Sequence, residues 1–108
     1  MYYRSKNSSS YTDVHVKDLG FLIKEQDAIL IDVRTPKEIA AGVIGQPLEI
    51  ELGLGMKEKF KSLDKNKKYI LYCRSGRRSV TASKIMAGLG FSDVNNLVGG
   101  YIAWKNGE

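Results

Sequence analysis

The stretch YILYCRSGRRS, from Tyr69 to Ser79, indicates the fold class and also contains the first candidate for a functional residue. Four apolar residues are followed at once by Cys73, the only cysteine of the chain, and by a loop with three arginines. A continuous apolar run is typical of a strand buried on both faces of a parallel sheet. The residues after the loop have a helical pattern, so the segment predicts a strand, a tight loop and a helix.

The rest of the chain repeats this alternation of strand and helix. Apolar or alternating runs predict further strands at residues 28–31, 48–52 and 94–98. Helical periodicity predicts helices around residues 16–23, 56–63 and 82–89, and the segment 35–38 (TPKE) has the capping-box pattern of a helix start. We therefore predict a single α/β domain that has a mostly parallel central sheet with helices on both faces.

Length and composition limit the organisation of the chain. Its 108 residues suffice for one domain with one core and are too few for two. Residues 1–10, MYYRSKNSSS, are polar and lack the apolar core of a secretory signal, so they predict a flexible tail before a domain at residues 11–108. No apolar stretch reaches the ~20 residues of a membrane span, and we expect no membrane association.

The counts of cysteine and histidine exclude several kinds of site. One cysteine cannot form an internal disulfide or a thioredoxin-type dithiol, and we expect a reducing compartment, the cytoplasm. Cys73 and the single histidine, His15, are too few for a zinc site, so we predict no metal. His15 precedes the first predicted helix, and we interpret it as a surface or edge-strand residue without a role as a base.

The chain carries a net charge of +5, much of it between Lys57 and Lys68. We interpret this run as a solvated helix face and a polar loop, because Phe60 and Tyr69 nearby have the pattern of core residues. Nucleic-acid binding is therefore not predicted. The fragment 53–55 (GLG) lacks the third glycine of a dinucleotide fingerprint, and no nucleotide site is predicted either.

The position of Cys73 favours a reactive thiolate over a small buried hydrophobe. Ligands of open α/β sheets bind beyond the carboxyl ends of the strands, and Cys73 follows such an end. A helix N-terminus and nearby arginines lower the pKa of a thiol, and Gly76 permits a tight loop. Arginines near a helix N-terminus oppose the helix dipole unless an anion binds there. We interpret Ser79 as a cap of the helix with a structural role.

Asp32 and Arg34 follow another predicted buried strand. Because carboxyl ends of parallel strands meet at one edge of a sheet, we expect both side chains to open onto the same rim as the thiol. We interpret them as supporting residues at that rim.

The loop resembles that of the rhodanese family, which carries sulfur as a cysteine persulfide. The family pattern Cys-x-x-Gly-x-Arg falls on Cys73, Gly76 and Arg78. Two further segments resemble family motifs in the right order: Asp32-Val33-Arg34 with Glu38 and Gly42, and Leu97-Val98-Gly99-Gly100 with Trp104. The segment from Val43 to Pro47 departs from the family pattern, which leaves the shape of that loop open. The resemblance extends from about Tyr11 to the end of the chain.

The resemblance implies a single-domain thiosulfate sulfurtransferase that needs no cofactor, and we expect it to be a monomer. Cys73 would take sulfane sulfur from a small anionic donor and pass it to cyanide, a thiol or a partner protein. The cradle for the persulfide would be formed by the backbone N–H groups of Arg74, Ser75, Gly76, Arg77 and Arg78. The three arginines would attract the donor. Arg78 has a second possible role, in which it turns inward and braces the loop.

Three alternatives are open to different degrees. A carrier that exchanges sulfur only with other proteins has the same sequence features as a small-molecule enzyme. A non-catalytic rhodanese-like binding module commonly lacks the cysteine, which is intact here. Phosphatases and arsenate reductases of similar fold use Cys-x5-Arg, and the residue at that spacing is Ser79 instead of arginine.

Overall fold

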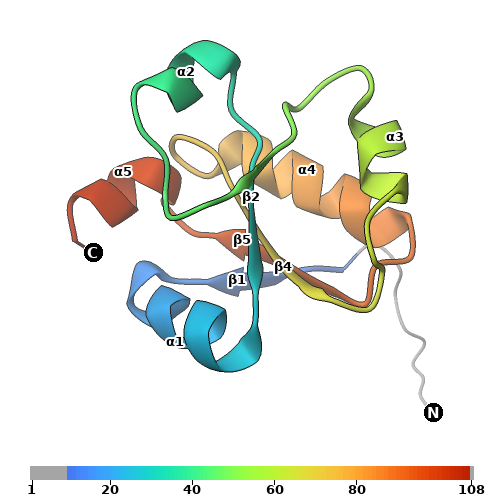
Figure 1. Cartoon of the computed structure of the whole chain (residues 1–108), viewed down its shortest axis with the longest axis horizontal. Helices are drawn as coiled ribbons and strands as arrows, with labels where there is room; N and C mark the ends of the chain where they lie inside the picture. Colours follow the sequence, from blue (N-terminus) through green and yellow to red (C-terminus); the bar gives the residue numbers. More distant parts are fainter. Residues whose placement is uncertain (1–9, 108) are drawn as a thin grey trace.

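The central sheet has five strands, which a computed structural model of the chain describes together with the rest of residues 10–107 (Figure 1). The strands are β1 (Thr12–Val14), β2 (Ile29–Asp32), β3 (Leu48–Glu49), β4 (Lys68–Tyr72) and β5 (Asp93–Leu97). Their order in the sheet is β1-β5-β4-β2-β3, and every neighbouring pair is parallel. The predicted α/β class is confirmed, and the sheet is entirely parallel, so all carboxyl ends lie at one edge.

Helices connect the strands. They are α1 (Val16–Gln26), α2 (Pro36–Ala40), α3 (Met56–Lys61), α4 (Arg77–Gly88) and α5 (Gly100–Lys105). The predicted capping box is confirmed, because the Thr35 hydroxyl accepts from the Glu38 N–H and the Glu38 carboxylate accepts from the Thr35 N–H. The short elements β1 and α5 were not predicted; Gly99 is the N-cap of α5 and Gly100 is its first residue.

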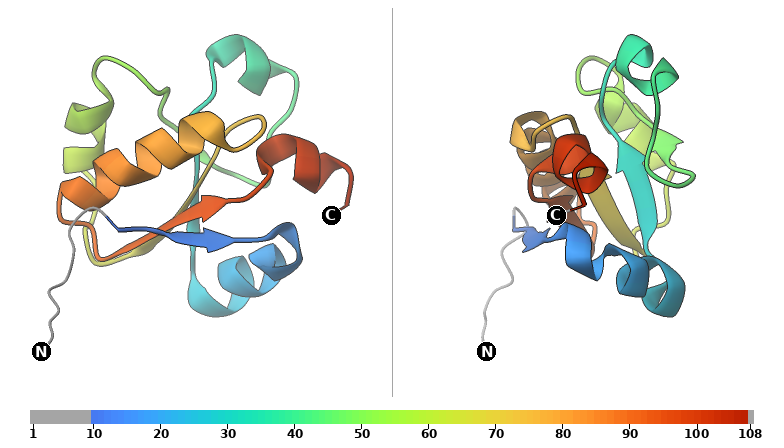
Figure 2. Two further views of the ribbon diagram at one scale, coloured as in Figure 1. Left: turned by 180° about the vertical axis from the view of Figure 1, so that it is seen from behind. Right: turned by 90° about the vertical axis from the view of Figure 1, so that its left-hand side faces the viewer.

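Two apolar layers enclose the sheet and confirm helices on both faces. On one face Met56 and Phe60 of α3 and Met86 of α4 pack against β4, and Figure 2 shows α4 lying along the sheet in its left view. On the other face Leu19 of α1 and Trp104 of α5 pack around the opposite side chains of the same strand. Because both faces are covered, the interior strands read as continuous apolar runs in the sequence.

The alternating run at residues 48–52 forms a shorter strand than predicted. Only Leu48 and Glu49 belong to β3, at the edge of the sheet. The next residues still follow β2, since the Ile50 N–H donates to the Asp32 carbonyl at 3.0 Å and the Leu52 N–H to the Val33 carbonyl at 3.1 Å. The chain then turns through two glycines into α3 instead of continuing as a strand.

The other predictions on composition have mixed outcomes. Phe60 and Tyr69 are buried and the lysines from 57 to 67 are exposed, as predicted. Lys68, the last residue of the predicted solvated run, instead begins β4, where it is half-buried and paired with Asp93. None of the helices within residues 10–107 is both long and apolar enough to cross a membrane. The predicted flexible tail falls on residues 1–10, of which residues 1–9 lie outside the described part of the chain.

The N-terminus of α5 holds the loop that follows β4. The Tyr101 N–H donates to the Cys73 carbonyl at 2.8 Å, and the Ile102 N–H donates to the Arg74 carbonyl at 3.0 Å. This approach requires glycine at position 100, where φ is +58° and a Cβ would meet the Cys73 carbonyl oxygen. The start of α5 therefore fixes the loop from behind.

We predict that Gly100→Ala lowers the free energy of unfolding by roughly 1–3 kcal/mol, because the added Cβ collides with the loop and φ is unfavourable. Gly20→Ala is the matched control: Gly20 lies inside α1 with nothing within 4 Å of an added Cβ. That change should raise the free energy of unfolding by about 0.5–1 kcal/mol. Urea unfolding measures the free energy of unfolding of both variants. Equal effects of the two substitutions would contradict the role of Gly100 in holding the loop after β4.

Candidate active site

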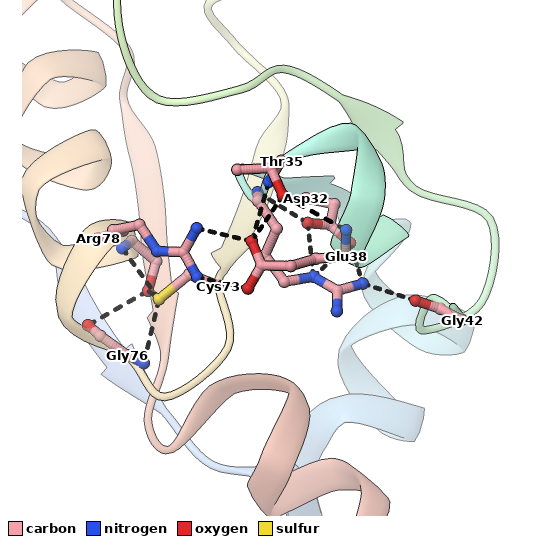
Figure 3. Close-up of polar contacts among 9 residues, drawn as sticks. Asp32, Thr35, Glu38, Gly42, Cys73, Gly76 and Arg78 are labelled. Atoms are coloured by element: carbon pink, nitrogen blue, oxygen red, sulfur yellow. Dashed lines mark hydrogen bonds and ion pairs between the residues drawn. The ribbon is translucent and has the colours of Figure 1, made fainter. Parts of the chain in front are cut away.

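The thiol of Cys73 lies at the centre of a tight loop between β4 and α4. The sulfur accepts hydrogen bonds from the Gly76 N–H at 3.1 Å and from the Ser79 N–H at 3.3 Å. The loop curls around it because Gly76, with φ of +110°, turns the chain into the first residue of α4. Figure 3 shows the sulfur facing Gly76 at the base of this loop. The backbone donors at the start of α4 are thus directed at one atom.

These contacts favour the thiolate. Burial, the largest influence, raises the pKa of Cys73, since the residue is only 1% exposed. Once the thiol is ionised, hydrogen bonds from the Ser79 side chain and from the N–H groups of Ser79, Gly76 and Ser75 together outweigh burial, so the pKa of Cys73 lies below its ordinary value. The arginines were expected to lower this pKa, but the hydrogen bonds of the loop are what lower it.

Ser79 does not cap the helix as predicted. The N-cap of α4 is Gly76, and Ser79 is the third residue of the helix. Its hydroxyl is buried and lies 3.4 Å from the Cys73 sulfur, which can donate its S–H to that oxygen. The prediction of a purely structural cap is therefore wrong, because Ser79 touches the thiol with both its N–H and its hydroxyl.

Arg78 braces the loop. Its guanidinium donates to both carboxylate oxygens of Glu38 on α2, each at 2.8 Å, a bidentate pair that Figure 3 shows bridging the two sides of the site. The hydrogen bond to Glu38 is the main cause of a raised pKa of Arg78, and the charge of Cys73 adds to it. Of the two roles that the sequence allowed, Arg78 takes the bracing one.

Asp32 and Arg34 lie at the predicted edge of the sheet but do not open onto a rim. They are 0% and 3% exposed, and Arg34 donates to both Asp32 oxygens at 2.8–3.1 Å. The Arg34 guanidinium also donates to the Gly42 carbonyl at 2.6 Å and lies 4.4 Å from the centroid of the Tyr101 ring. This buried pair ties the segments after β2 and the start of α5 together, so it supports the site without facing the thiol.

The loop presents its remaining side chains to solvent: Arg74, Ser75 and Arg77 are all exposed. His15 is exposed at the start of α1, which packs on the face of the sheet opposite to Cys73. Within residues 10–107 no group of three or more His, Cys, Asp or Glu residues has the arrangement of a metal site. The charged side chains that the loop exposes beside the Cys73 thiol are thus those of Arg74 and Arg77.

Sequence reasoning missed two partners of this site. Glu38 was noted only as part of a motif, and its distance of 40 residues from Arg78 hides their contact. Asn96 was read as part of a strand, yet it accepts from the Ser79 hydroxyl at 2.6 Å. Two asparagines inside an otherwise apolar run at residues 94–98 were the available signal, because buried amides need specific partners.

Fold and site together define a class: an all-parallel α/β domain with a cysteine held by the backbone of a loop that begins a helix. The family model for the rhodanese-like domain matches residues 15–107. The chain therefore belongs to the rhodanese-like domain family.

Individual relatives agree with this assignment. The putative sulfurtransferase YtwF of Bacillus subtilis is 42% identical over 81 residues, which are 75% of this chain and 77% of that protein. The thiosulfate sulfurtransferase GlpE of Pseudomonas syringae is 29% identical over 83 residues, 77% of each chain. The crystal structure of a rhodanese-related protein from Thermoplasma volcanium, 32% identical, superimposes with a TM-score of 0.80 over 90% of this chain and 93% of that one.

We predict that Glu38→Gln weakens the fold in a pH-dependent way. The Arg78 guanidinium, more than any other group, lowers the pKa of Glu38 from its ordinary 4.5 to about 2. Stability from this pair is therefore complete above about pH 4.5 and is lost as the pH falls towards 2. Near neutral pH the variant should lose roughly 1–2 kcal/mol of unfolding free energy, and the difference from the wild type should shrink towards pH 3.

The control is Glu58→Gln, which removes a carboxylate from the exposed pair with Lys61 on α3. Because exposed pairs contribute little, this variant should stay within ~0.5 kcal/mol of the wild type at every pH. Thermal unfolding between pH 3 and 7 gives the comparison. A Glu38→Gln deficit that does not depend on pH would contradict the role of the ion pair.

Proposed function

We propose that this protein is a sulfurtransferase that carries sulfane sulfur as a persulfide on Cys73. A small anionic donor such as thiosulfate would supply the sulfur, and a thiophilic acceptor (cyanide, a thiol or a partner protein) would remove it. The observation that carries the proposal is the pair of N–H contacts, 3.1 and 3.3 Å, that converge on the thiol sulfur. Membership in the rhodanese-like family and the names of the relatives support the same chemistry.

The first step is attack of the Cys73 thiolate on the outer sulfur of thiosulfate. A bond forms between the two sulfurs, the sulfur–sulfur bond of thiosulfate breaks, and sulfite leaves with the electron pair. No proton has to move if the cysteine is already ionised, so the absence of a histidine near the thiol in the described part of the chain is compatible with this step. The loop donors then remain to hold negative charge on the persulfide.

The second step returns the enzyme to its starting state. A nucleophilic acceptor attacks the outer sulfur of the persulfide, and the bond between the two sulfurs breaks. The Cys73 thiolate is the leaving group, and it again accepts the hydrogen bonds of the loop. With cyanide the product is thiocyanate. The donors at Gly76 and Ser79 stabilise this leaving group as they stabilise the resting thiolate.

Charge at the mouth of the loop supports an anionic donor. Arg74 and Arg77 are exposed beside the cradle, whereas Arg78 is neutralised by Glu38. Screened attraction by two surface cations raises the local concentration of a dianion such as thiosulfate. The donor name carried by the Pseudomonas syringae relative points the same way. A phosphatase is disfavoured, because its arginine clamp would fall on Ser79, whose hydroxyl contacts the thiol.

The test is the intact mass of the reduced protein after incubation with thiosulfate, and again after addition of cyanide. We expect a gain of one sulfur atom that cyanide removes, with sulfite and thiocyanate released in equal amounts. Cys73→Ser is the matched control and should gain nothing, because it removes the only thiol of the chain. Sulfur retained on that variant, or none on the wild type with thiosulfate or a persulfide donor, would refute the proposal.

A further inference from the structure

A line of polar side chains runs from the surface of the sheet to the active-site thiol. Asp13 of β1 and Asn96 of β5 are register partners, so their side chains lie on the same face of the sheet. The Asn96 Nδ2 group donates to the Asp13 carboxylate at 3.1 Å. Its Oδ1 accepts from the Ser79 hydroxyl at 2.6 Å, and that hydroxyl lies 3.4 Å from the Cys73 sulfur. Four residues from three elements thus form one chain of contacts.

Asp13 fixes the orientation of the amide. An ionised carboxylate only accepts hydrogen bonds, so the amide nitrogen of Asn96 must face Asp13 and the amide oxygen must face Ser79. Asn96 is 3% exposed between β1 and α4, and the two ends of its amide contact Asp13 and Ser79, so the partner at one end selects which atom faces the other. The exposed Asp13 carboxylate therefore determines that the Asn96 amide oxygen faces the buried Ser79 hydroxyl.

The Ser79 hydroxyl has one proton and three neighbours that compete for it. The Asn96 oxygen at 2.6 Å is closer than the Gly76 carbonyl at 3.3 Å, so the proton is directed to Asn96. The Ser79 oxygen is then left as an acceptor for the S–H group of Cys73. If the thiol ionises, the hydroxyl can stabilise the sulfur only by turning its proton away from Asn96.

We propose that Asn96 and Asp13 are positioning residues that hold the Ser79 hydroxyl proton away from the Cys73 sulfur and so limit the ionisation of the thiol. The inference concerns the nucleophile of the proposed function and rests on it for biological meaning. Its test measures ionisation and not sulfur transfer, so it succeeds or fails separately from the persulfide experiment.

Other charged groups face the loop from neighbouring elements. Arg78 of α4 is paired with Glu38 of α2, and Asp32 is paired with Arg34 beyond β2. Of these, Arg78 interacts with the charge of Cys73. All of them are unchanged in the variants below, so their influence on the thiol cancels in the comparison. We call the line of contacts from Asp13 through Asn96 and Ser79 to Cys73 the relay. Asp13 is its only charged side chain apart from the ionised thiol, so the Asp13 variants need a control that separates the loss of charge from the loss of the hydrogen bond.

The experiment follows the Cβ resonance of Cys73 against pH in full-length protein labelled with carbon-13 cysteine; a single cysteine gives a single signal. Asn96→Leu removes the competing oxygen and should increase the acid dissociation constant of the thiol by about 10-fold, the effect of one hydrogen bond to a charged atom. Ser79→Ala should change this constant by less than that, because Asn96 holds the hydroxyl proton away from the sulfur in the wild type. In the double variant Asn96→Leu should have no effect, because no hydroxyl remains to be released.

Two results would overturn the relay: an unchanged or decreased dissociation constant in Asn96→Leu, or an equal effect of that change in the Ser79→Ala background. If Asn96→Leu does not fold, the exposed Asp13 decides. Asp13→Ala frees the amide to turn and should increase the dissociation constant, whereas Asp13→Asn removes the same charge but keeps an acceptor for Asn96 and should have the smaller effect. Equal effects of the two Asp13 variants would show that Asp13 acts on the thiol only through its charge and not by orienting Asn96, which would refute the proposal.

Discussion

Backbone N–H groups that point inward at one sulfur atom are the constraint on which the rest of this site depends. A thiolate that is 1% exposed loses nearly all of its hydration, which alone would keep the thiol protonated. Each hydrogen bond to a charged atom contributes about 1.5–3 kcal/mol, so the donors of Gly76 and Ser79 together are of the size needed to offset that loss. The direction of the pKa of Cys73, below its ordinary value, agrees with this balance.

A loop can direct its N–H groups inward only if other contacts prevent it from relaxing. The start of α5 donates to the carbonyls of Cys73 and Arg74, which directs the N–H groups of the same two peptide units, those of Arg74 and Ser75, to the opposite side. The Arg78–Glu38 pair joins the start of α4 to α2, and the buried Asp32–Arg34 pair joins the end of β2 to the segment at Gly42. Arg78, one of the three arginines that were expected to attract the donor, thus acts by holding the loop, and Arg74 and Arg77 remain as its exposed cations.

The fold was largely predictable because its determinants are local. The run from Tyr69 to Tyr72 and the helical stripe after it specify the strand and the helix that carry the loop, and the capping box at Thr35 marks α2. The elements β1 and α5 were not predictable in this way, since each is short and is defined by its contacts with β5 or with the loop.

The site was predictable only in its centre. Cys73 and the loop follow from the sequence, but the partners of Arg78 and Ser79 are 40 and 17 positions away along the chain. Burial also reversed two expectations. An arginine that is 3% exposed and paired with Asp32 does not open onto the rim, and a serine three residues into a helix is past the N-cap position. Such facts depend on the packing of distant segments, which composition and spacing do not encode.

The most direct test of this account is the ionisation of Cys73 in the folded chain compared with the same chain unfolded in urea, read from the Cβ resonance of the single cysteine. The unfolded chain supplies the reference, because its thiol is solvated and has none of the loop contacts. The account predicts that the folded protein ionises at a lower pH than the unfolded one. An equal or higher pH of ionisation in the folded protein would show that burial dominates and that the loop does not hold a thiolate.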